Sequence, residues 1–185
     1  MEREVKEYGV EQLSRSRGGR LIFGLLLATA LCLAVNPPQA RAEVFQSRFL
    51  RFRLPDGWKC KLEENVFSCE PPVTRGQKLP MLIVLAAKLQ GSQDTLPDYM
   101  IHLRKPSTVD GPKINNNIGE VAWVEATLYE SEVKNFYTKY LATVWDGIAL
   151  LVTFSAHKDS WDQFQPLIAP CIKSLEVKDD WKKKQ

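Results

Sequence analysis

Two histidines are the first residues of this chain to examine for acid–base chemistry. His157 stands two positions before Asp159, and a histidine with a nearby carboxylate has the residue types of a general base and its orienting partner. His102 stands far from this pair, in a different predicted element. A histidine just before a helix is more often a surface residue, and we interpret His157 in that way. The alternative is a hydrolase or small-ligand binder that uses His157, Asp159 and residues 107–119.

Glu130 and Glu132 are a second candidate, because carboxylate pairs hydrolyse glycosides where they flank a cleft. They lead into a turn at the end of a predicted strand, so we interpret them as solvated charges. The sequence contains no G-x-S-x-G nucleophile elbow, no phosphate-binding loop and no dinucleotide fingerprint. Its histidines and cysteines lack the spacing of a metal site. We therefore predict no enzyme, with no catalytic, cofactor-binding or metal-ligating residue.

Three cysteines lie after residue 42, so one of them has no partner within the chain. Cys60 and Cys69 fall in two short predicted strands, 58–62 and 66–69. Two antiparallel strands joined by residues 63–65 would place these cysteines opposite each other, which is close enough for a disulfide after a small adjustment. We predict a structural Cys60–Cys69 bond, because a redox pair usually has the C-x-x-C spacing. Cys171 belongs to an apolar helical stripe and is predicted to be reduced and buried.

The first 42 residues have the pattern of a signal peptide. Three arginines precede an uncharged run, residues 21–35, which is shorter than the ~20 residues that span a bilayer. Ala40 and Ala42 are small residues at the two positions that a signal peptidase reads. We predict cleavage after Ala42 and export to the periplasm or the exterior, with no stable membrane span left. An uncleaved anchor is the alternative.

The remaining chain has the length of one domain, which typically takes ~100–150 residues. We predict a single domain over residues 43–178 and a basic tail over residues 179–185. With 25 Lys+Arg against 22 Asp+Glu, the chain has no electrostatic footprint for nucleic acid. Trp181 in the tail is a possible anchor for a partner protein, and it could equally pack back on the domain.

Strand patterns dominate the predicted domain. Residues 45–54 alternate as a first strand, and the continuous apolar run 81–89 predicts a central strand buried on both faces. Residues 107–119 hold proline, glycine and three asparagines, which favours a long exposed loop. Three further strands are predicted at residues 121–130, 135–145 and 148–156. Asp-Gly between the last two strands indicates a tight hairpin, since a type I′ turn needs positive φ at both positions.

Two helices complete the prediction. Thr95 can cap a short middle helix that stops before Pro106. Residues 161–175 carry apolar side chains at helical spacing, preceded by Asp159 or Ser160 as a cap. Two prolines inside this segment predict a kink or two helical pieces. The element order predicts an α+β fold with a mostly antiparallel sheet, a short middle helix and a C-terminal helix.

Two stretches of this sequence resemble the PsbP-like superfamily. One is Phe-Arg-Leu-Pro-Asp-Gly-Trp at residues 52–58, and the other is the strand at residues 149–156 that leads into the last helix, with Lys-Ser-Leu at residues 173–175. The superfamily includes extrinsic photosystem subunits, a Ran-binding protein and bacterial secretion-associated chaperones. The resemblance implies an α/β/α sandwich that binds or assembles proteins without catalysis. We therefore predict an exported module of the bacterial envelope with another envelope protein as its partner and no cofactor.

Overall fold

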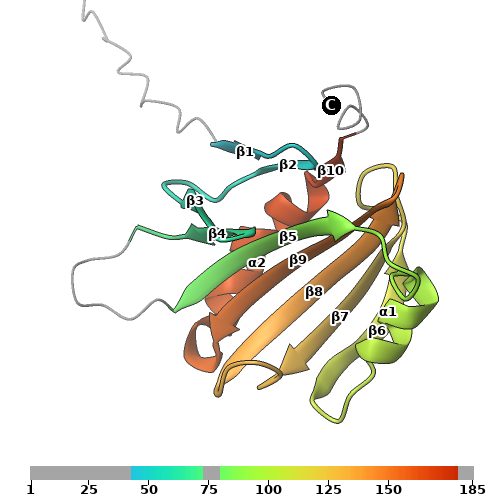
Figure 1. The fold of residues 1–185 in the computed structure, drawn as a ribbon. Coiled ribbons are helices and arrows are strands. Elements are labelled where there is room, and N and C mark those ends of the chain that lie inside the picture. The colour runs from blue at the N-terminus through green and yellow to red at the C-terminus, as the bar shows by residue number, and fades with distance from the viewer. Residues whose placement is uncertain (1–42, 73–79, 179–185) are drawn as a thin grey trace, which may run out of the picture. The chain divides into compact units, whose positions relative to one another are not determined.

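A seven-stranded antiparallel sheet forms the centre of the computed structural model, which describes residues 43–72 and 80–178 (Figure 1). These residues all belong to one compact unit. The strand order is β3-β4-β5-β9-β8-β7-β6, so consecutive strands are neighbours except where β5 joins β9. The strands are β3 (Lys59–Glu63), β4 (Val66–Glu70), β5 (Met81–Leu89), β6 (Thr108–Asn115), β7 (Trp123–Tyr129), β8 (Phe136–Trp145) and β9 (Ile148–His157).

The β8–β9 hairpin is the longest pairing between consecutive strands. Its register runs without a shift from the pair Phe136 and His157 to the pair Trp145 and Ile148. Asp146 has φ 50° and Gly147 has φ 79°, the left-handed values that a type I′ turn requires. The predicted Asp-Gly hairpin is therefore confirmed, and its turn holds the exposed ring of Trp145 at one end of the sheet.

A second, three-stranded sheet brings the first and last described segments together. It has the order β1-β2-β10, with β1 (Val44–Gln46), β2 (Leu50–Arg53) and β10 (Glu176–Val177). We predicted one strand over residues 45–54, and the structure divides it into two. The reason is Ser47, whose hydroxyl accepts the backbone N–H groups of Phe49 and Leu50 and so replaces ladder hydrogen bonds by a turn.

The two helices lie on opposite faces of the large sheet (Figure 1). Helix α2 (Trp161–Lys173) follows a short 3-10 turn, η1 (Lys158–Ser160), and packs with the small sheet over one face. Trp58 stacks on Phe164 of α2 with ring centroids 6.0 Å apart, and both side chains are buried. Helix α1 (Leu96–His102) lies on the other face, against β7 and β8. The fold is thus the α+β, α/β/α arrangement that we predicted.

Helix α2 is one continuous helix with both prolines inside, so the predicted alternative of two helical pieces is wrong. Pro166 and Pro170 are one turn apart and exposed, so the carbonyl groups that lose their intrahelical donors face solvent. The opposite face buries Phe164, Ile168 and Cys171 in the core, and this packing holds the helix together.

The loop predicted for residues 107–119 is also wrong over most of its length. Residues 108–115 form β6, the edge strand beside β7. Its register shifts twice, on either side of Asp110, and it contains Gly111 and Pro112. An edge strand tolerates proline and bulges because one row of its backbone groups needs no strand partner. The turn residues therefore mark irregularities within a strand.

Strand β5 is buried on one face and half-open on the other. Ile83 and Leu85 lie in the core beneath α2, whereas Leu82, Val84 and Ala86 are partly exposed. The prediction that β5 is buried on both faces is wrong. The helix on its open face, α1, has only seven residues and packs on β7 and β8. Among the described residues, no helix is long and apolar enough to cross a membrane.

Candidate functional site

The structure brings His157 and Asp159 together at an exposed position. The Nδ1 atom of His157 is 3.3 Å from a carboxylate oxygen of Asp159, whose side chain is 74% exposed. The same nitrogen accepts the Asp159 backbone N–H at 3.4 Å. His157 lines neither of the two grooves described below. Residues 108–115, the third part of the alternative site, lie at the sheet edge, with β8 and β7 between them and β9.

The other predicted polar residues make local contacts. His102 is exposed on α1, and its Nδ1 atom lies 2.8 Å from the backbone carbonyl oxygen of Asp98. Glu130 accepts the backbone N–H of Asn135 across the β7–β8 turn. Glu132 accepts the hydroxyl of Tyr140 at 2.7 Å. The two glutamates thus bind different groups of the turn, and they do not face each other across a cleft.

The cysteines are placed as predicted. Cys60 and Cys69 are cross-strand neighbours in the β3–β4 hairpin and form a disulfide. Cys171 is a buried free thiol whose pKa burial raises to about 11. Because disulfides persist outside the reducing cytosol, this bond indicates export. Trp181, the tail at residues 179–185 and the predicted leader at residues 1–42 lie outside the described residues.

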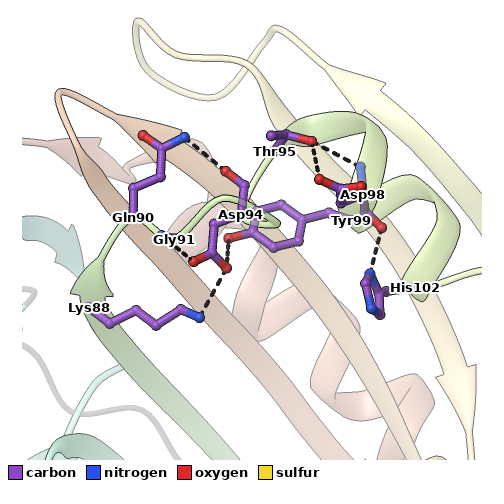
Figure 2. A network of polar contacts seen from close by, with 8 residues as sticks. All are labelled: Lys88, Gln90, Gly91, Asp94, Thr95, Asp98, Tyr99 and His102. Carbon is purple, nitrogen blue, oxygen red and sulfur yellow. Dashed lines mark hydrogen bonds and ion pairs between the residues drawn. The ribbon is translucent and has the colours of Figure 1, made fainter.

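A buried carboxylate that the sequence analysis missed organises the loop before α1 (Figure 2). Asp94 accepts the Gly91 backbone N–H at 2.8 Å and the Tyr99 hydroxyl at 3.1 Å, and Lys88 Nζ lies 3.0 Å away. The Gly91 N–H lowers the pKa of Asp94 most; burial opposes this shift, and Lys88 and Tyr99 reinforce it. The sequence feature that could have indicated this role is the position of Asp94 in a turn, between Gly91 and the helix cap Thr95.

The Asp94 network fixes a loop and is not poised for proton transfer. Both carboxylate oxygens are already hydrogen-bonded, so an added ligand would have to displace one of these partners. Burial raises the pKa of Tyr99, and the neighbouring Asp94 raises it further, so the Tyr99 hydroxyl remains a donor. In the described parts of the chain, no group of three or more His, Cys, Asp or Glu residues is arranged to hold a metal ion.

The first groove, which we call the α1 groove, lies beside this network on the half-open face of the sheet. It has a volume of about 840 Å³. Small side chains such as Ala86, Ala142 and Ala149 form part of its lining, with Leu151 beside them and Tyr99 on the helix side. The α1 groove is therefore mainly apolar. Of its ionisable lining residues, Lys88 and Asp94 are engaged with each other, and His102 also lines the groove.

The second groove, which we call the basic groove, lies where the small sheet meets the C-terminal end of α2. It has a volume of about 780 Å³. Its cationic lining residues are Arg51, Arg53, Lys173 and Lys178, and its acidic ones are Glu120 and Glu176.

Two of these cations have no carboxylate partner among the described residues. Arg51 Nε donates to Glu176 across the β2–β10 pair at 3.0 Å. Arg53 is instead opposite Val44 in the β1–β2 pair. Neither Arg53 nor Lys173 forms an ion pair within residues 43–72 and 80–178.

Exposed apolar side chains line the basic groove together with the cations. Trp145 at the β8–β9 turn is 39% exposed, and Val44 of β1 is 53% exposed. Tryptophan and arginine are enriched in the centre of protein–protein interfaces. The basic groove therefore has the composition of a recognition surface.

No family model and no curated protein matches this chain. Solved structures do match it. The solution structure of cyanobacterial PsbP (CyanoP) from Synechocystis sp. is similar with a TM-score of 0.53 and 14% identity, over 77% of this chain and 96% of that chain. A crystal structure from Bacteroides thetaiotaomicron is similar with a TM-score of 0.51 and 15% identity, over 75% of this chain and 49% of that chain. The chain thus spans about half of the Bacteroides protein, and the PsbP-like fold is confirmed.

Proposed function

From this PsbP-like fold, we propose that the chain is an exported, non-enzymatic module of the bacterial envelope that binds or helps to assemble another protein. The observation that carries the proposal is the basic groove, in which Arg53 and Lys173, which form no ion pair within the described residues, line one recess with the exposed Trp145. Arginine and tryptophan contribute much of the binding energy in protein interfaces, because arginine forms charge-assisted hydrogen bonds and tryptophan supplies a large contact area.

The polar groups of the described domain support binding over catalysis. Asp94 is held by three partners, and His102 Nδ1 is engaged with a backbone carbonyl. The pair His157 and Asp159 is exposed and lines neither groove. A general base needs a positioned substrate within hydrogen-bond reach, and an open surface supplies no such position.

Export is supported by the disulfide and by the sequence pattern of residues 1–42. A bond such as Cys60–Cys69 forms and persists mainly in an oxidising compartment such as the periplasm or the exterior. Cleavage after Ala42 would leave Glu43 as the N-terminus, one residue before β1. Mass spectrometry of the protein from the envelope fraction tests this step, and a native chain that retains Met1 would contradict cleavage.

Site-specific photo-cross-linking in the producing cell tests protein binding. A photoreactive phenylalanine replaces Trp145 in the basic groove, and a matched variant carries the same residue in place of Leu167 on α2. Leu167 is 43% exposed, close to the 39% of Trp145, but it lies outside both grooves.

We expect a discrete product of higher mass with the Trp145 variant and none with the Leu167 variant. The product should contain one second protein, identified by its peptides. Equal labelling from both positions, or no product from either, would overturn binding through this groove.

A further inference from the structure

We infer that the basic groove receives an acidic, extended segment of the partner protein that carries an apolar side chain. This inference rests on the proposed function, and it adds the chemistry of the segment that is bound. It depends on the charges of the groove, the way they are paired, and the apolar surface between them.

The strand pairing gives the two arginines of β2 different partners. Arg51 and Arg53 both point to the outer face of the small sheet, two residues apart on β2. The sheet satisfies Arg51 with Glu176 of β10, whereas it places Val44 opposite Arg53. Arg53 therefore presents a guanidinium that has no carboxylate partner in the described part of the chain, and a guanidinium binds a carboxylate through two parallel hydrogen bonds.

Lys173 adds a second available cation from a different element. It lies in the last turn of α2, while Lys178 lines the groove just after β10. Arg53 and Lys173 thus come from two different parts of the chain, and a ligand with several negative charges can contact both of them. A single small anion would neutralise only part of this lining.

Two features of the groove disfavour the binding of an anion, but the effect of each is limited. Glu176 is already engaged by Arg51, which leaves Glu120 as the lining carboxylate without an ion pair in the described residues. The C-terminal end of α2 carries partial negative charge. Ser174 caps it, since its N–H bonds to the carbonyls of Pro170 and Cys171 and its hydroxyl also donates to Cys171.

The apolar part of the groove favours a peptide over an inorganic anion. Trp145 and Val44 are exposed beside the cations, so a bound segment can bury a leucine or phenylalanine against them. Such burial contributes about 1.5–3 kcal/mol for one large side chain. A bilayer surface with anionic headgroups is flat, whereas these cations line a recess of about 780 Å³.

Fluorescence anisotropy with synthetic peptides tests the inference on the full-length protein as it is isolated. The probe is a labelled peptide of alternating Asp and Glu with one central phenylalanine. Two comparison peptides keep the phenylalanine and replace the acids by Asn and Gln, or by Lys and Arg.

The variants are Arg53→Glu and Lys173→Glu, with Lys158→Glu as the matched control. Lys158 is also exposed and makes the same charge change, but it lies in η1 at the opposite end of α2 and lines neither groove. Thermal unfolding verifies that each variant is folded before binding is measured.

We expect the acidic peptide to bind and its Kd to rise about tenfold or more in each groove variant, because charge reversal replaces attraction by repulsion. Added salt should weaken binding in the same direction. Lys158→Glu should leave Kd unchanged within about twofold. The Lys and Arg peptide should bind the Arg53→Glu, Lys173→Glu double variant better than the wild-type chain.

Equal affinity for the acidic and neutral peptides, or an equal loss in Lys158→Glu, would overturn the inference. Binding to vesicles with about 30% phosphatidylglycerol in phosphatidylcholine, without binding to the acidic peptide, would also overturn it in favour of a membrane surface. If Trp145 cross-links a protein in cells but no acidic peptide binds, the inference fails and the proposed function stands.

Discussion

Gly119 lies directly against the backbone of Leu175, just before β10. A Cβ atom on residue 119 would be 2.8 Å from the Leu175 carbonyl oxygen, which is closer than such atoms approach in folded proteins. Gly119 also has φ 59°, a left-handed conformation that favours glycine. This contact joins the segment before β7 to the end of α2, and both residues line the basic groove.

Gly119→Ala is expected to lower the free energy of unfolding by about 1–3 kcal/mol, because the added methyl group strains the backbone and pushes on Leu175. Gly111→Ala is the control, since a Cβ at residue 111 meets no atom within 4 Å. Urea unfolding followed by tryptophan fluorescence measures both variants. An equal loss of unfolding free energy in both variants would show that the close contact between Gly119 and Leu175 does not cause the destabilisation.

Removing the disulfide through a Cys60→Ala, Cys69→Ala double variant is expected to cost roughly 2–3 kcal/mol of unfolding free energy, as for a short loop. The bond fixes the register of the β3–β4 hairpin, whose Cys69 is fully buried. Peptide mapping without reduction gives the connectivity. A linked peptide containing Cys171, or free thiols at both Cys60 and Cys69 in the exported protein, would contradict the pairing.

Asp94 makes stability depend on pH in the acidic range. Its pKa in the folded protein lies below the ordinary value of an aspartate, so the carboxylate contributes stability at neutral pH. That contribution is lost as the pH falls from about 4 through the lowered pKa. Asp94→Asn should cost about 1–3 kcal/mol at pH 7, and its difference from the wild type should shrink on acidification.

Thermal unfolding from pH 7 to pH 2 measures this difference. The control is Asp56→Asn, because Asp56 is exposed in a turn where asparagine is equally accepted. If the difference in stability between Asp94→Asn and the wild type stays constant over this pH range, the pKa of Asp94 is not lowered in the folded protein.

His157→Ala tests the alternative function. Its side chain makes an exposed contact with Asp159 and packs edge-on against Phe136 at a centroid distance of 5.5 Å. We expect a stability change within about 1 kcal/mol and unchanged photo-cross-linking at Trp145, as for surface substitutions. Loss of a defined hydrolytic or ligand-binding activity in a folded His157→Ala protein would favour the hydrolase or ligand binder.

Features that depend on neighbours in sequence were predictable. The Asp146-Gly147 hairpin and the Thr95 cap follow from turn and capping chemistry within a few residues. The Cys60–Cys69 pair follows from the register of one short hairpin. Turn propensity gave a wrong prediction for residues 108–115, because the pairing of β6 with β7 outweighs the preference of Gly111 and Pro112 for a loop.

The basic groove could not be read from the sequence. Arg53 and Ser174 are 121 positions apart, and the hydrogen bond from the Arg53 N–H to the Ser174 hydroxyl joins their segments in space. The pairing of β2 with β10 then determines which arginine is satisfied and which is left available. No local pattern encodes this choice, since Arg51 and Arg53 occupy equivalent positions on β2.

The most direct test of a protein-binding role is the native mass of the chain extracted gently from the cells that produce it. The wild type and Trp145→Ala are compared by size-exclusion chromatography with mass detection, with Leu167→Ala as the control. We predict that the wild type and Leu167→Ala elute with a second protein in fixed ratio, whereas Trp145→Ala elutes largely without it. Elution of all three folded proteins at the same mass, without a second protein, would contradict the account.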